Sequence, residues 1–424
     1  MNRITIEQKI NEMAEICCDV LVVGGGTAGV FAAISASLTG ADTLLIEKNQ
    51  MLGGTLTYAG VNFPGLFFAW GKQIISGPCY DAVLETARLG GAKIPDYTAQ
   101  KQSHDENQIL INKHIYTYVI HKMCTDSGAR VICNSMISYI EETSDGVFAI
   151  ITDKSGMKKI KAKTLIDATG DANCAQLLGY PLMTRQTVQP ASLQNHISGY
   201  NPDDVDIEEI RVKLSKVKLP FDVTAENIMF YLKIHKINTS SVCHDASTSE
   251  GKTELDFRAV NELMDFYLFM RSVKGLEKLN VDYMAAETGV RESNRIIGIS
   301  TVTARDYLNG KFYEDSVCYS FYPIDVHVEN RIDNINLKRD VVPKIPYSAL
   351  IPKESKKIIC AGRCISSDVF ANSALRVEAS CMAMGQVCGC AASVASRDNS
   401  DFKNVPYNKL CDLLESVGAI VPKK

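Results

Sequence analysis

A glycine-rich turn between an apolar strand and a helix of small residues constrains the fold of this chain more than any other feature. The strand covers 19–23, and residues 24–29 read Gly-Gly-Gly-Thr-Ala-Gly, which fits the pattern G-x-G-x-x-G. A helix over 30–36 follows, and a second strand over 43–46 ends at Glu47. This order of strand, turn, helix, strand and acid is typical of a Rossmann-like unit. The segment therefore predicts an α/β fold.

Each part of this unit has a physical role in holding a dinucleotide. Gly24 permits the tight turn, Gly26 lets the backbone approach a pyrophosphate, and Gly29 lets helix and strand pack closely. The helix N-terminus offers free N–H groups and the positive end of its dipole to phosphates. Glu47 lies about 20 residues beyond the turn, where a carboxylate accepts from a ribose hydroxyl. An ordinary glycine-rich turn would not account for Glu47, so we predict a dinucleotide site.

Composition places the chain among globular proteins and argues against several kinds of partner. Its 424 residues are 46% hydrophobic and 22% charged, and the net charge of −4 gives no broad basic surface for nucleic acid. No apolar run approaches the roughly 18 residues that span a membrane. Residues 1–16 lack the apolar core of a signal peptide. We expect a cytoplasmic protein with no nucleic-acid or membrane partner, and a homo-oligomer is compatible with the composition.

The 14 cysteines do not have the spacing of a metal or redox site. The pairs at 17/18, 360/364 and 388/390 lack the C-x-x-C pattern. Most of the cysteines lie in apolar stretches, where a free thiol packs as a small hydrophobic group. A cytosolic location keeps such thiols reduced. We therefore expect no metal and a packing role for most cysteines.

The rest of the chain predicts a second domain inserted into the first. Residues 136–163 alternate polar and apolar positions between turn signals, which indicates a β-meander, and a buried strand follows over 164–168. Residues 185–285 are richer in charge and in helical patterning. The predicted fold is α/β, with a Rossmann-like dinucleotide-binding domain, an inserted β-meander and a second α+β substrate domain. The predicted boundaries are 1–184 for the first part, 185–330 for the inserted domain and 331–424 for the return part.

Several local patterns complete the prediction. Apolar spacing indicates helices over 78–91 and 108–127, and a strand over 358–361 precedes a long helix of small residues over 374–395. Residues 61–70 are an aromatic loop that contains the only tryptophan. This loop is equally compatible with the wall of a pocket and with core packed beneath a long loop.

Together these segments resemble the FAD-dependent oxidoreductases of the glutathione-reductase structural class. The resemblance covers nearly the whole chain and is closest to the large bacterial group called simply FAD-dependent oxidoreductase. The matching segments, in chain order, are 24–47, 52–55, 166–171, 289–298 and 360–364 with the helix beyond. The resemblance implies FAD as the cofactor.

The resemblance also implies which residues hold the adenosine half of FAD. The turn at 24–29 would bind the pyrophosphate, and Glu47, with Lys48 beside it, would bind the adenosine ribose. The backbone of Ile137 would contact adenine. Residues 168–170 would line the adenosine side at the end of their strand.

A second group of residues is implied for the flavin half. Residues 53–55 would pass near the ribityl chain and the isoalloxazine. Gly362 and Arg363 would lie near the ribityl chain and pyrophosphate, although relatives often carry an acid where this chain has Arg363. Residues 372–374 would bring a helix N-terminus to the pyrimidine ring, where its dipole would stabilise the reduced flavin. The implied FAD contacts are Gly24, Gly26, Thr27, Ala28, Gly29, Glu47, Lys48, Gly53, Gly54, Thr55, Ile137, Ala168, Thr169, Gly170, Gly362, Arg363, Asn372, Ser373 and Ala374.

Four residues are candidates for the chemistry. On a helix, Arg291 and Arg295 would share one face and clamp a carboxylate or another oxygen-rich group, with Glu292 pairing with one of them. Tyr322 and His327 would donate or accept a proton. The two arginines are also compatible with a structural ion-pair network or with the flavin phosphates. Tyr322 and His327 are also compatible with packing on an alternating strand.

We expect an FAD-dependent dehydrogenase or reductase that transfers a hydride between flavin N5 and a small organic substrate, which carries a carboxylate or hydroxyl group. A flavin monooxygenase is one alternative, but the chain has no second G-x-G-x-x-G for a nicotinamide cofactor. A non-redox or structural flavoprotein is another. The sequence identifies neither the substrate nor the electron donor or acceptor.

Overall fold

A seven-stranded sheet forms the centre of the larger part of the molecule in the computed structural model, which describes residues 13–97, 107–183, 188–237, 242–328 and 331–424. The strand order is β5-β2-β1-β8-β7-β6, and β15 also pairs with β8. The pairs of β1 with β2 and β8, of β2 with β5 and of β15 with β8 are parallel, whereas β6, β7 and β8 form an antiparallel meander. The strands are β1 (Glu15–Val23), β2 (Thr43–Glu47), β5 (Arg130–Cys133), β6 (Met136–Glu142), β7 (Val147–Asp153), β8 (Gly156–Asp167) and β15 (Ile358–Cys360). The predicted α/β fold with its inserted meander is confirmed.

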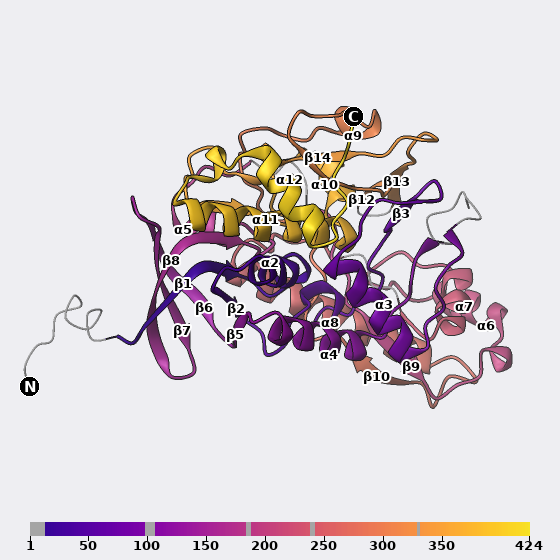
Figure 1. Ribbon diagram of the computed structural model, residues 1–424. Coiled ribbons are helices and arrows are strands. Elements are labelled where there is room, and N and C mark those ends of the chain that lie inside the picture. The colour runs from indigo at the N-terminus through magenta and orange to yellow at the C-terminus, as the bar shows by residue number, and fades with distance from the viewer. Residues whose placement is uncertain (1–12, 98–106, 184–187, 238–241, 329–330) are drawn as a thin grey trace, which may run out of the picture.

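Helices from distant parts of the sequence pack around this sheet. The most extensive packing joins α2 to α11 (Figure 1). The helices of the larger part are α2 (Thr27–Leu38), α3 (Pro78–Gly90), α4 (Lys113–Asp126), α5 (Asn173–Leu177), α9 (Ala304–Leu308), α10 (Val369–Leu375), α11 (Glu378–Asp398) and α12 (Tyr407–Ser416). Three short ribbons lie beside them: β3 (Phe68–Ala69) with β4 (Lys72–Gln73), β11 (Ser316–Tyr319) with β14 (Lys344–Pro346), and β12 (Ile324–Val328) with β13 (Arg331–Ile335).

The apolar content of the central strands explains their position. The residues of β1 from Val20 to Val23 are almost wholly buried, and β2 is buried along its whole length. Continuous apolar strands of this kind are typical of parallel sheets that are covered on both faces. The small residues of α2 and α11 then let the two helices approach each other closely.

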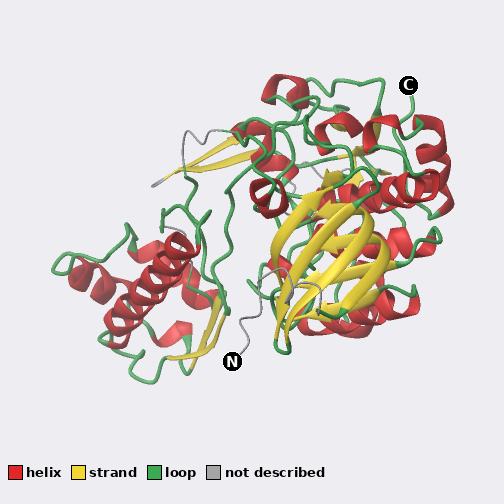
Figure 2. Cartoon of the chain, turned by 90° about the vertical axis from the view of Figure 1, so that its left-hand side faces the viewer, coloured by secondary structure: helices red, strands yellow, loops and turns green. Residues whose placement is uncertain are grey.

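A smaller unit has its own hydrophobic core. It comprises β9 (Asn195–Ser198), β10 (Asn280–Met284), α6 (Ile207–Leu214), α7 (Ala225–Lys233) and α8 (Ser249–Arg271), and its core includes Ile197, Leu263 and Phe266. Figure 2 shows a group of helices and a strand pair set apart from the body that holds the large sheet. Buried residues between Val302 and Val326 belong to the core of the larger part. The domain boundaries themselves stay a prediction.

Three of the differences from the predicted bounds concern β8, α4 and the helix expected over 374–395. Strand β8 is a single strand over Gly156–Asp167, where two consecutive strands were expected, because one edge of it continues the meander while its end pairs with β1 and β15. Helix α4 begins at Lys113, since the Asn112 side chain caps it by accepting from two backbone N–H groups. The helix expected over 374–395 is interrupted at 376–377 and forms α10 and α11.

Helix α11 is a core helix. Among the described residues, it is the one helix that is long and apolar enough to cross a membrane by length and composition. From the sequence, we expect no apolar run of that length. The apolar stretch of α11 is entirely buried inside the protein. The 14 cysteines are all free thiols, and ten of them are buried, among them Cys360, Cys364 and Cys388.

Candidate functional site

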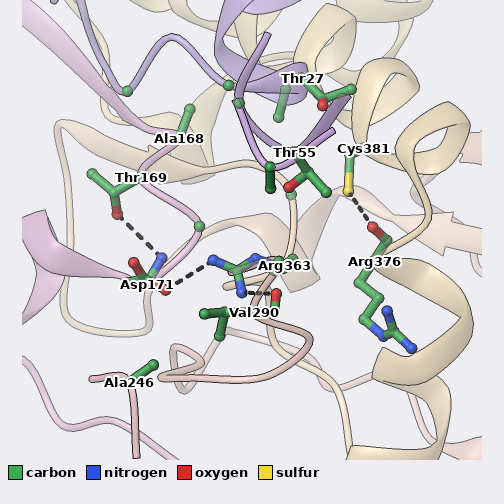
Figure 3. A pocket seen from close by; sticks show the side chains of 18 of the residues that line it. Thr27, Thr55, Ala168, Thr169, Asp171, Ala246, Val290, Arg363, Arg376 and Cys381 are labelled. Atoms are coloured by element: carbon green, nitrogen blue, oxygen red, sulfur yellow. Dashed lines mark hydrogen bonds and ion pairs between the residues drawn. The ribbon is translucent and has the colours of Figure 1, made fainter. Parts of the chain in front are cut away.

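One cavity of about 1220 Å³ lies where the larger part meets the smaller unit. Segments far apart in the sequence line it, from the β1–α2 turn to the start of α11 (Figure 3). Of the residues predicted from sequence, those on its wall are Gly24, Gly26, Thr27, Ala28, Glu47, Lys48, Gly54, Thr55, Ile137, Ala168, Thr169, Gly170, Arg291, Tyr322, His327, Gly362 and Arg363. Gly29, Gly53, Arg295, Asn372, Ser373 and Ala374 are not on its wall.

The three glycines that define the G-x-G-x-x-G pattern, Gly24, Gly26 and Gly29, differ in what surrounds them. A Cβ on Gly24 would lie 2.6 Å from the Ala168 carbonyl oxygen, and a Cβ on Gly29 would lie 1.8 Å from that of Gly24. These two positions therefore require glycine for packing within the protein. A Cβ on Gly26 would meet nothing within 4 Å, so the space beside Gly26 is open. No side chain caps α2, and its first turn holds no acidic residue, which suits an anion at that end.

Glu47 ends β2 beneath the turn and is only 6% exposed. One carboxylate oxygen accepts from the backbone N–H of Gly25 at 2.5 Å, and the other accepts from that of Asn49 at 2.8 Å. Burial raises the pKa of Glu47, and the two N–H donors oppose that effect. The carboxylate is thus held at the cavity wall by the backbone on both sides, with lone pairs left to accept from a ligand hydroxyl.

The loop after β2 packs directly on the glycine turn. The backbone N–H of Gly53 donates to the Gly25 carbonyl at 2.8 Å, and Gly53 has a φ of +103°. A Cβ on Gly54 would lie 2.9 Å from Cα of Gly26. The contact explains why both glycines are needed, and it brings Gly54 and Thr55 to the cavity while Gly53 stays behind them.

The aromatic loop is divided between the two roles that its sequence allows. Val61 and Phe63 line the cavity. Phe67 is buried in the main core, and the indole N–H of Trp70 donates to the Val341 carbonyl at 3.0 Å. Both interpretations of this loop are therefore correct for part of it.

Arg363 is paired with an acid and does not stand free toward a phosphate. Its Nη2 lies 2.9 Å from a carboxylate oxygen of Asp171, and its Nη1 donates to the Val290 carbonyl at 2.5 Å (Figure 3). Asp171 follows β8, whose last residue Asp167 accepts from the backbone N–H of Cys174 in α5 at 2.9 Å. The pair thus ties the turn after β15 to the end of β8 and to the loop at 289–291.

The prediction that residues 372–374 begin a helix beside the cavity is wrong. They lie in the second half of α10, and the Asn372 side chain donates to the Arg363 carbonyl at 2.9 Å. The helix that begins at the cavity is α11, whose N-cap is Val377 and whose first residue, Glu378, lines the wall. The Asp368 side chain caps α10 by accepting from the backbone N–H of Ala371. Helix α10 therefore begins at Val369, before the predicted start at residues 372–374.

The expectation that Arg291 and Arg295 share a helix face is also wrong, because the segment from 289 to 298 is extended and irregular. Arg291 lines the cavity and donates to the Pro190 carbonyl. Arg295 is buried, and its Nη1 lies 2.6 Å from Glu292. Glu292 does pair with one of the two arginines, Arg295, which does not line the cavity.

His327 and Asp325 form a hydrogen-bonded pair on β12. His327 Nε2 lies 3.1 Å from Asp325 Oδ2, and the backbone N–H of His327 donates to the Gln189 side chain at 3.2 Å. Burial lowers the pKa of His327, and the nearby Arg291 lowers it further against the effect of Asp325. Burial alone would raise the pKa of Asp325, but His327, Arg376 and Arg291 together hold it below its usual value. His327 is therefore neutral and Asp325 ionised near neutral pH.

Arg376 and Glu378 are two of the cavity-wall residues that sequence reasoning missed. Arg376 lies between α10 and α11, with Nη2 3.9 Å from Asp325 Oδ2. Glu378 is 9% exposed, and burial raises the pKa of its carboxyl to about 7. Both stand in the sequence inside a predicted helix, and only the break at 376–377 turns them toward the cavity. No sequence signal marked that break.

The residues present fit a bound FAD. The cavity is larger than the 300–1,000 Å³ of a typical small-molecule pocket, which leaves room for a dinucleotide. The uncapped start of α2 and the open space at Gly26 suit a pyrophosphate, and the buried Glu47 carboxylate suits a ribose.

Comparisons with known proteins point to the same cofactor. A family model described as FAD dependent oxidoreductase matches residues 19–414. Digeranylgeranylglycerophospholipid reductase 1 of Methanothermobacter thermautotrophicus is 28% identical over 196 residues, which cover 44% of this chain and 47% of that protein. Fumarate reductase (cytochrome) of Shewanella frigidimarina is 37% identical over 98 residues, which cover 22% of this chain and 16% of that protein. The chain thus spans about half, or less, of the length of these curated relatives.

Among solved structures, a geranylgeranyl bacteriochlorophyll reductase-like protein from Thermoplasma acidophilum superposes with a TM-score of 0.47 at 15% identity. The superposition covers 95% of this chain and 84% of that chain.

Proposed function

Because this chain belongs to the FAD dependent oxidoreductase family, we propose that it is a dehydrogenase or reductase that transfers a hydride between bound FAD and a small organic substrate. One observation carries the proposal. A single cavity joins the β1–α2 turn, with its anion-binding helix end, to Arg291, Tyr322 and His327. Cofactor and substrate would thus share one cavity, as hydride transfer requires.

Bound FAD would supply the hydride chemistry, and the protein would bind, orient and manage one proton. The start of α2 would hold the pyrophosphate through backbone N–H groups, and Glu47 would hold the ribose. The start of α11 brings the positive end of a buried helix to the cavity wall, which favours negative charge there.

His327 and Tyr322 are the proposed proton carriers. With Nε2–H of His327 donating to Asp325, Nδ1 is the proton acceptor of the neutral ring. The backbone of Tyr322 is fixed on both sides by Tyr307, whose hydroxyl accepts from Tyr322 N–H at 3.1 Å and donates to its carbonyl at 2.9 Å. Such fixation of the backbone supports a role in orienting substrate.

The relatives named above include reductases, which supports a redox role over a purely structural flavin. A cytoplasmic location, a separate electron donor or acceptor, and a homo-oligomeric state belong to the same proposal.

The test begins with the purified protein loaded with FAD. We expect a yellow protein that dithionite bleaches and that substrate candidates reoxidise, followed by flavin absorbance under anaerobic conditions. A protein that binds FAD but whose spectrum no donor or acceptor changes would contradict the proposed enzyme. A protein that binds no FAD would contradict the cofactor site itself.

A further inference from the structure

Two guanidinium groups face the cavity close to each other. Arg291 reaches the wall from the irregular segment at 289–298, and Arg376 reaches it from the break between α10 and α11. Burial lowers the pKa of Arg291 to about 9, and the like charge of Arg376 adds to this effect. Burial also lowers the pKa of Arg376. Two cations this close and this deeply placed require negative charge nearby.

The acids around Arg291 and Arg376 do not supply enough negative charge to balance them. Asp325 is ionised, but it also serves His327 and lies 3.9 Å from Arg376. Glu378 acts on Arg376 as well, but its pKa of about 7 leaves it half protonated near neutral pH. Two other acids of the region are already paired: Glu292 lies 2.6 Å from Arg295, and Asp171 lies 2.9 Å from Arg363. Among the described residues, the acids that act on Arg291 and Arg376 therefore balance their two positive charges only in part.

The hydrogen bonds of the two guanidinium groups are also incomplete. Arg376 Nε is buried and has no hydrogen-bond partner in the part of the chain that the structure describes. Its Nη2 makes one long contact, 3.4 Å, to the Asp325 carbonyl. Arg291 donates through Nη1 to the Pro190 carbonyl, which satisfies one of its five N–H donors. Planar forks with spare donors and unmatched charge are the usual partners of a carboxylate.

We propose that Arg291 and Arg376 together bind the carboxylate group of an organic acid, which is the substrate of this enzyme. The inference rests on the proposed function and names the substrate class for it. The phosphates of FAD already have a separate binding place at the start of α2, where the helix end is uncapped. A carboxylate held by both forks would complete the charge balance and would fix the neighbouring carbon atoms within the cavity. Asp325 and His327 then lie on the same wall as this anchor.

The experiment titrates the FAD-loaded protein with pairs of ligands that differ only in charge: acetate with acetamide, and benzoate with benzamide. Binding is followed by the change in flavin absorbance. We expect the carboxylates to bind and the amides to bind about 10- to 100-fold more weakly, because charged hydrogen bonds would be lost. Arg291→Gln and Arg376→Gln should weaken carboxylate binding by a similar factor while FAD stays bound. Arg376→Lys should recover part of the affinity, since charge returns without the fork.

Arg88→Gln is the matched control, because Arg88 is exposed and pairs only with Glu85 on α3 among the described residues. It should leave both affinities unchanged. Equal binding of acids and amides would overturn the carboxylate site while FAD binding and reduction, and with them the proposed function, stand. Loss of FAD from Arg291→Gln or Arg376→Gln would overturn it too, because the guanidinium groups would then serve the cofactor. Inorganic phosphate that binds as tightly as benzoate would show a general anion site and would contradict the substrate class.

Discussion

Glu378 is a buried carboxyl whose raised pKa predicts a stability that depends on pH. Burial raises its pKa from 4.5 to about 7, against the opposing effects of Arg376 and Arg363. Its surroundings also include Tyr116 and Cys381, whose pKa values are raised by burial and by Glu378. The folded state therefore prefers the protonated form. An acid with a raised pKa contributes its full stability below the unfolded value, and that contribution is lost as the pH rises through the folded value.

The free energy of unfolding should accordingly fall by about 3 kcal/mol from this group between pH 4.5 and 7. Glu378→Gln, which keeps the shape and removes the titration, should flatten that part of the profile. Denaturant unfolding of the two proteins at pH 5 and pH 8, with and without FAD, measures the difference. Identical pH profiles would mean that Glu378 is ionised in the folded protein.

A substitution at Gly26 should affect FAD binding without affecting the folding of the protein. Because a Cβ there would meet nothing within 4 Å, Gly26→Val should fold with an unchanged melting temperature when FAD is absent. The valine side chain would fill the space expected for the pyrophosphate, so FAD affinity should fall about tenfold or more. Fluorescence titration with FAD measures this, and Gly26→Ala should show a smaller loss. A yellow, fully loaded Gly26→Val protein would contradict the assignment.

At the scale of elements, close contact with α11 holds α2, the helix that follows the glycine turn, against the core. A Cβ on Gly385 would lie 2.1 Å from the Ala28 carbonyl oxygen, and one on Gly389 would lie 2.3 Å from that of Ala32. Both obstacles are backbone atoms, which cannot move aside without shifting a helix. Gly385→Ala should therefore lower the free energy of unfolding by about 1–3 kcal/mol, despite the better helix propensity of alanine.

Gly90→Ala in α3 is the matched control for this change. Its Cβ would meet the end of the Ile115 side chain at 3.2 Å, a group that can rotate away. We expect little change or a small gain in stability at position 90, measured by the same chemical unfolding. Equal effects at both positions would mean that α2 and α11 are less closely packed than the distances require.

The helices and strands were predicted correctly where the structure depends on a local sequence pattern. The prediction was wrong where the structure depends on contacts with residues far away in the sequence. The apolar strand, the glycine turn and Glu47 gave β1, α2 and β2, because each depends on its own residues. The i and i+4 spacing of Arg291 and Arg295 indicated a helix, yet this segment is held by isolated bridges, such as Ser192 with Gly289 and Leu182 with Ile296. Those partners lie about 100 residues away, and spacing within a segment carries no information about them.

At the scale of the whole molecule, the sequence predicted the α/β fold, its meander and the order of the motifs that line the cavity. It did not predict which side chains meet there. Arg363 pairs with Asp171, and Arg376 faces Asp325, across long separations in sequence. Such pairs depend on the docking of α10 and α11, which no motif describes. Motifs therefore located most of the predicted FAD contacts on the cavity wall, and the structure was needed to find the charge pairs there.

The smaller unit closes the cavity from the side of Glu47. Glu287 lies 3.7 Å from Lys48 of the larger part and 3.7 Å from Lys252 of α8, which also contacts Asp256 at 2.6 Å. Residues 246–249 line the same cavity. A ligand bound there would contact both units at once. Its binding energy would therefore stabilise the contact between the two units as well as the part of each unit that it touches.

FAD should therefore slow amide hydrogen exchange in residues 246–252 as well as in the β1–α2 turn, although these segments lie in different cores. Exchange followed by mass spectrometry, with and without FAD, measures both segments in one experiment. Gly26→Val is the control, since it should remove both protections together. Protection of the turn alone would mean that the smaller unit is not part of the cofactor site, and that its residues serve only the entry of substrate.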